Sequence, residues 1–125
     1  MRPQYHFRRV GDDIHIWNVR KLLELAEDLP VIQLPLADIQ EIDEPYWFDI
    51  GDSAPTCRAI MEHARQAASS DLNYPILLCA DGRIMDGMHR VIKALSMDHA
   101  TILARKLNRT PPPNFKNVPA EDLSY

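Results

Sequence analysis

The stretch from Pro75 to Leu107 constrains the fold more than any other part of this 125-residue sequence. Residues 76–79 form a short apolar run, which is typical of a buried strand. The dipeptide Asp81-Gly82 follows it and predicts a tight hairpin, because glycine readily adopts the positive φ that such a turn requires. Residues 83–85 are expected to return as a second strand. From residue 88 onward the apolar side chains recur with helical spacing, so the stretch predicts a hairpin followed directly by a helix.

The junction between this hairpin and the helix carries the strongest chemical signal. Gly87 allows a ligand to approach the backbone closely, and His89 and Arg90 place hydrogen-bond donors in the first helical turn. A helix N-terminus also presents unpaired N–H groups and about half a positive charge, which together favour anion binding. The sequence equally allows a structural interpretation, in which Asp86 caps the helix, Arg90 is solvated and His89 packs on the sheet.

The run DGRIMDGMHRVIKAL resembles the ParB/sulfiredoxin-like superfamily, whose members carry a Gly-x-His-Arg or Gly-x-Arg-Arg element after a hairpin. The resemblance extends loosely over Pro35 to Leu107 and is sharpest from Asp86 to Arg90. In that superfamily the element binds nucleotide phosphates. The resemblance therefore implies a phosphate or nucleotide site at Asp86, Gly87, Met88, His89 and Arg90.

Met88 marks a departure from the sulfiredoxin branch of this superfamily. In sulfiredoxins the residue after the glycine is the catalytic cysteine, and a thioether cannot replace a thiolate nucleophile. We therefore do not expect sulfinic-acid repair. Met88 is expected to pack, or to line the pocket as a polarizable apolar group.

Two further segments are candidates for the ligand site. Thr56 and Arg58 lie in the first turn of a helix predicted over residues 55–68, and the resemblance loosely implies that such residues contact the nucleotide. The consecutive aromatic residues Tyr46, Trp47 and Phe48 cannot all point inward, so they are a candidate pocket wall. The same three residues would also suit a partner interface or the edge of the core. We expect a two-sided cleft, closed by this loop and by the early turn of the helix.

Composition and charge exclude several other classes of protein. Hydrophobic residues make up 46% and charged residues 26%, which is an ordinary globular balance, and the net charge of −4 does not favour binding to nucleic acid. No apolar run approaches the roughly 20 residues of a membrane span, and the N-terminus does not resemble a signal peptide. Cys57 and Cys79 lack metal-ligand spacing and are expected to be reduced core residues, so we expect a cytoplasmic protein. No metal site is expected, because His6 and His15 lack a clear third ligand.

The predicted fold class is α/β (α+β), with a small mixed β-sheet packed by about three helices. A single ParB/sulfiredoxin-like domain is expected over residues 1–107, and a Pro-rich tail over residues 108–125 either drapes over it or trails free. Outside the central stretch, a hairpin is predicted at 5–17, helices at 19–29 and 55–68, strands at 31–34 and 101–104, and a single helical turn at 36–39. The buried face of the second helix is expected to consist of Cys57, Ile60, Met61 and Ala64.

Three functions are compatible with this sequence. The first is a nucleotide- or phosphoanion-binding domain, for which phosphoryl transfer and nucleotide hydrolysis are compatible activities, with ATP, ADP or CTP and Mg²⁺ as candidate cofactors. The second is a non-catalytic interaction or regulatory module of the same fold, for which an oligomer is allowed. A nuclease-like enzyme comes third, since the acidic balance disfavours nucleic acid as a partner. No catalytic residue can be assigned from the sequence.

Overall fold

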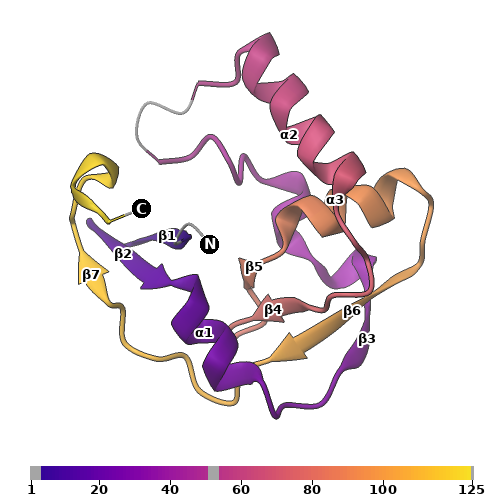
Figure 1. Cartoon of the computed structure of the whole chain (residues 1–125), viewed down its shortest axis with the longest axis horizontal. Helices are drawn as coiled ribbons and strands as arrows, with labels where there is room; N and C mark the ends of the chain where they lie inside the picture. Colours follow the sequence, from indigo (N-terminus) through magenta and orange to yellow (C-terminus); the bar gives the residue numbers. More distant parts are fainter. Residues whose placement is uncertain (1–3, 51–53, 125) are drawn as a thin grey trace.

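The computed structural model describes residues 4–50 and 54–124, and it confirms an α+β fold with three α-helices and two small sheets. The four-stranded sheet has the order β3-β6-β4-β5, and the three-stranded sheet has the order β1-β2-β7 (Figure 1). The predicted single sheet is therefore divided, with the N-terminal hairpin forming a sheet of its own. No helix in the described ranges combines the length and the apolar character needed to cross a membrane.

The four-stranded sheet contains the stretch that the sequence predicts best. The strands β4 (Ile76–Leu78) and β5 (Ile84–Asp86) form an antiparallel hairpin around Gly82, which has a φ of +84°. The helix α3 (Met88–Ser96) follows and leads into β6 (Thr101–Lys106), which is parallel to β4. The edge strand β3 (Ile32–Pro35) pairs antiparallel with β6, and the single 3-10 turn that follows at Leu36–Asp38 confirms the predicted one.

This sheet is covered on both faces, as the alternation of its side chains requires. Ile76 and Leu78 of β4 belong to one buried cluster, which includes Val91 of α3. Leu77 lies on the opposite face, in a second cluster with Leu22 of α1 (Val19–Ala26). The sheet is thus sandwiched between α1 and α3.

The helix α2 (Cys57–Ser69) packs against α3, but its predicted buried face is wrong. Cys57, Ile60, Met61 and Ala64 are all exposed, with Ile60 at 52% and Met61 at 42%. Ala67 is the buried residue of this helix, because α2 touches the body of the domain along a narrow strip facing α3. An apolar stripe on α2 therefore faces solvent. Cys79, in contrast, is fully buried as expected, and both cysteines are free.

The Pro-rich tail drapes over the domain rather than trailing free. The strand β7 (Phe115–Lys116) pairs with β2 (Asp13–Asn18), which itself pairs with β1 (Tyr5–Val10). The Asn114 side chain accepts a hydrogen bond from the backbone N–H of Asn18 at 2.8 Å. The indole N–H of Trp17 donates to the carbonyl of Pro111 at 2.9 Å. Residues 108–124 are thus part of the folded domain, and the tail ends in a 3-10 turn at Ala120–Asp122.

The acidic loop after β3 is partly buried. Glu41, in a 3-10 turn at Gln40–Asp43, is only 2% exposed, and its carboxylate accepts a hydrogen bond from the backbone N–H of Ile84. Arg83 lies 3.7 Å from the same carboxylate and forms a two-point ion pair with Glu44. These contacts hold the loop against β5, and so they position the aromatic residues that follow it.

Candidate functional site

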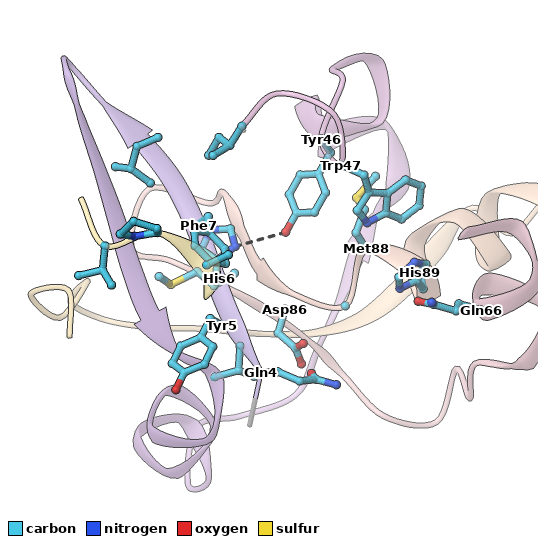
Figure 2. A pocket seen from close by; sticks show the side chains of 18 of the residues that line it. Gln4, Tyr5, His6, Phe7, Tyr46, Trp47, Gln66, Asp86, Met88 and His89 are labelled. Atoms are coloured by element: carbon cyan, nitrogen blue, oxygen red, sulfur yellow. Dashed lines mark hydrogen bonds between the residues drawn. The ribbon is translucent and has the colours of Figure 1, made fainter. Parts of the chain in front are cut away.

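A cleft of about 1200 Å³ lies between the N-terminal hairpin and the junction of β5 with α3. Most of its described walls come from the hairpin, the Tyr46–Trp47 loop, the β5–α3 junction and the C-terminal tail, and α1 and α2 contribute Val19 and Gln66 (Figure 2). The lining residues are Gln4, Tyr5, His6, Phe7, Ile14, Val19, Tyr46, Trp47, Ile50, Gln66, residues 85–89 and residues 117–121.

The β5–α3 junction is built around Gly87, but for a reason other than the one predicted. Gly87 has a φ of +107°, and a Cβ at this position would lie 2.7 Å from Cγ2 of the buried Ile76 and 2.9 Å from Nη2 of Arg90. The space beside its Cα is therefore occupied by the protein itself. The fold requires glycine here for its backbone conformation and for close packing. The close approach of a ligand does not explain this glycine.

Arg90 is engaged within the fold. Its guanidinium donates to the carbonyls of Tyr74 and Pro75 at 2.8 and 2.7 Å, and it forms an ion pair with Asp86 at 2.9 Å. Its side chain is 15% exposed, so the alternative of a solvated Arg90 is wrong. Asp86 binds this arginine and does not cap α3. Arg90 does not line the cleft. A contact between Arg90 and a phosphate remains a prediction, and it would require Arg90 to leave Asp86 and the two carbonyls.

The N-terminus of α3 opens toward the cleft. Its N-cap is Gly87, so no side chain caps the first turn, and Gly87, Met88 and His89 all line the cleft. N–H groups of an uncapped first turn are available to a ligand oxygen. Met88 is 5% exposed and belongs to the core cluster next to α3, as expected for an apolar packing residue.

Two histidines and a tryptophan form a stack beside this helix end. Nδ1 of His63, from α2, lies 2.9 Å from Nε2 of His89, from α3, so the two imidazoles are joined by a hydrogen bond. The indole of Trp47 stacks over both rings, with centroids 4.1 Å from His63 and 4.7 Å from His89. Desolvation lowers the pKa of His63, and desolvation together with His63 lowers the pKa of His89 to about 4. Both rings are therefore neutral at pH 7.

A second polar pair crosses from the loop to the hairpin. The hydroxyl of Tyr46 lies 3.5 Å from Nδ1 of His6, at the long limit of a hydrogen bond (Figure 2). His6 is 8% exposed, and burial together with Arg8 lowers its pKa to about 3. Burial raises the pKa of Tyr46, and the nearby carboxylates of Glu41 and Asp86 add to that effect. The pair is thus a neutral imidazole beside a protonated phenol.

The predicted candidates divide into two groups in space. Tyr46 and Trp47 line the cleft together with Asp86, Gly87, Met88 and His89. Phe48 does not line it, and its ring packs edge-on against His63 instead. Thr56 and Arg58 do not line it either: Thr56 is the N-cap of α2, and its hydroxyl accepts from the N–H of Ala59. The wall predicted from the early turn of α2 is formed instead by the N-terminal hairpin and the tail.

Several residues of the cleft were not identified as site residues from the sequence. His6, Gln66 and the tail residues 117–121 come from segments more than 40 residues apart. Only His6 had a local signal, as a polar residue within an alternating strand. Within residues 4–50 and 54–124, no three His, Cys, Asp or Glu side chains lie close enough together to hold a metal ion.

No protein-family model, curated protein or solved structure matches this chain. The functional interpretation therefore depends on the geometry of the cleft and on the resemblance in the Asp86–Arg90 element.

Proposed function

We propose that this protein binds a nucleotide or a related phosphorylated small molecule in the cleft at the β5–α3 junction. The observation that carries the proposal is the uncapped N-terminus of α3, which opens into a cleft walled by Tyr46 and Trp47. Free N–H groups suit a phosphate oxygen, and an aromatic wall suits the base and sugar. The resemblance of the Asp86–Arg90 element to the ParB/sulfiredoxin-like superfamily supports the same conclusion, and free Cys57 and Cys79 are consistent with a cytoplasmic setting.

We propose binding without assigning a reaction. The described residues of the cleft supply neutral histidines, a phenol and carboxylates, and none of these is placed as an activated nucleophile. Mg²⁺ remains a candidate cofactor that would bind together with the nucleotide. Asp86, which directly precedes the N-cap of α3, is the candidate carboxylate ligand for it. Phosphoryl transfer would need an acceptor molecule, and hydrolysis would need a water molecule, that the histidines, the phenol or the carboxylates of the cleft could position.

The test is calorimetric titration of the full chain with a panel of nucleotides, each with and without Mg²⁺. We expect His89→Ala to weaken binding by about ten-fold, as for the loss of a hydrogen bond or a stacking wall. Arg58→Ala should leave the affinity unchanged, because Arg58 does not line the cleft. Absence of binding by every nucleotide, with the protein folded, would refute the proposal.

A second candidate function is that of a protein-interaction module, which the exposed stripe of α2 favours. Cys57, Ile60, Met61 and Ala64 place apolar surface on the solvent side of this helix. Such stripes are usually buried against another element. Sedimentation equilibrium of the wild type and of Ile60→Lys tests whether a second copy covers it: a self-association lost in the variant supports this function, and a monomer in both cases excludes a homo-oligomer through α2.

A further inference from the structure

The charges around the cleft restrict which nucleotide could bind in it. Among the described lining residues there is neither lysine nor arginine, whereas Asp86 and Glu121 contribute two carboxylates. The two lining histidines, His6 and His89, have pKa values lowered to about 3 and about 4, so neither carries a positive charge at neutral pH. Apart from the helix end, the described walls thus supply no compensation for an anion.

Three arginines in segments that border the cleft are committed to other contacts. Arg90 forms an ion pair with Asp86 and donates hydrogen bonds to two backbone carbonyls. Arg8 donates to the carbonyl of Ile84 at 3.3 Å and lies over the ring of Trp17 at 5.4 Å. Arg83 is paired with Glu44. Moving any of these to a ligand would leave a carboxylate or buried carbonyls without a partner, which costs free energy.

We propose that the ligand is a nucleoside or nucleoside monophosphate, and that the cleft selects against di- and triphosphates. This inference rests on the proposed function and narrows it. The end of α3 provides about half a positive charge and a few N–H donors, which suits one phosphate group. Each additional phosphate places more negative charge beside Glu121, and the described walls hold no lysine or arginine to compensate it; Arg90 already offsets the charge of Asp86 in their ion pair.

The experiment is a calorimetric titration of the full chain with the nucleoside, monophosphate, diphosphate and triphosphate of adenine and of cytosine. It is run at low ionic strength, because salt screens the repulsion, and with and without Mg²⁺. We expect the affinity to fall by about ten-fold or more from the monophosphate to the triphosphate in both conditions. A triphosphate that binds as tightly as the monophosphate, in either condition, overturns the inference while leaving the proposed function intact. If no member of either series binds, the proposed function itself fails.

Two charge variants test the physical cause of this selectivity. Asp86→Asn and Glu121→Gln each remove a carboxylate of the cleft. Each variant should lower the ratio of monophosphate affinity to triphosphate affinity by about three-fold or more. The matched control is Asp28→Asn, on an exposed residue that does not line the cleft, which should leave the ratio unchanged. Because Asp86 also holds Arg90, Glu121→Gln remains decisive if Asp86→Asn fails to fold. A ratio unaffected in both variants would overturn the electrostatic explanation.

Discussion

Replacing Gly87 with alanine should destabilise the domain far more than the same change at Gly82. Both glycines have positive φ, +107° and +84°, so an alanine at either position is strained by about 1–2 kcal/mol. At Gly82 nothing lies within 4 Å of the added Cβ, and that strain is the whole expected cost. At Gly87 the Cβ would meet Cγ2 of Ile76 at 2.7 Å and Nη2 of Arg90 at 2.9 Å.

Neither neighbour of Gly87 can move away freely. Ile76 is fully buried in the core cluster, and Arg90 is fixed by three hydrogen bonds. Overpacking of this kind costs about 1–3 kcal/mol, so together with the backbone strain the total for Gly87→Ala is about 2–5 kcal/mol. The difference between the two variants is therefore about 2 kcal/mol.

Urea unfolding followed by circular dichroism measures this difference, provided that the m-values agree. A double-mutant cycle isolates the part of the steric cost that is due to Cγ2 of Ile76: in an Ile76→Ala background this atom is absent, and Gly87→Ala should cost less than in the wild type. The contact with Nη2 of Arg90 remains in that background, so the cost should still exceed that of Gly82→Ala. Equal losses for Gly87→Ala and Gly82→Ala in the wild-type background would refute the close packing at the β5–α3 junction.

Three further results are expected. Arg90→Ala should lower the free energy of unfolding by about 2–4 kcal/mol, since it removes a partly buried ion pair and two hydrogen bonds, as measured by urea unfolding. Because the pKa of His89 is lowered from 6.5 to about 4 on folding, the unfolded chain binds more protons in this range, and the free energy of unfolding should fall as pH decreases from 6.5 to 4. Trp47 lines the cleft and Trp17 does not, so ligand binding should change the fluorescence of a Trp17→Phe variant more than that of a Trp47→Phe variant.

Each of these results has its control. Arg58→Ala removes an exposed arginine and should change stability little, so a similar loss at both arginines would contradict the role given to Arg90. His89→Gln should reduce the pH dependence of unfolding without abolishing it, because the pKa values of His6 and His63 are also lowered, whereas His99→Gln, at an exposed position, should leave it unchanged. A pH-independent wild type would contradict the desolvation of His89. Ligand-induced fluorescence from Trp17 alone would place the ligand outside the cleft.

The parts of the fold that sequence patterns predicted are those specified by neighbouring residues. The β4–β5 hairpin, α3 and β6 depend on a glycine turn and on apolar spacing within about 30 residues, and all were found within one or two residues of their predicted bounds. The N-cap of α1 is a signal of the same kind, since the side chain of Asn18 accepts from the N–H of Lys21. Such signals are local, so a sequence displays them directly.

The parts that were missed depend on contacts between distant segments. The helix α2 has apolar residues at helical spacing. Such spacing predicts an apolar stripe along the helix, but it does not predict whether another element packs against that stripe. The partners of Arg90 at Tyr74 and Pro75 are backbone carbonyls, which no residue type reveals. The pairing of His63 with His89 arises from the packing of two helices, and each histidine alone has an ordinary structural interpretation.

The tail that completes the cleft also sets when the cleft can form. Residues 117–121 face hairpin residues that precede them by about 100 positions, and the pairing of β7 with β2 spans the same interval. Contacts this distant in sequence close a long loop and tend to form late in folding. We therefore expect the hairpin and the β4–α3–β6 unit to assemble first, with the site appearing only as the tail docks. A ligand that contacts both walls would then slow the undocking of the tail, and protection of the β2 amides from hydrogen exchange would report its occupancy.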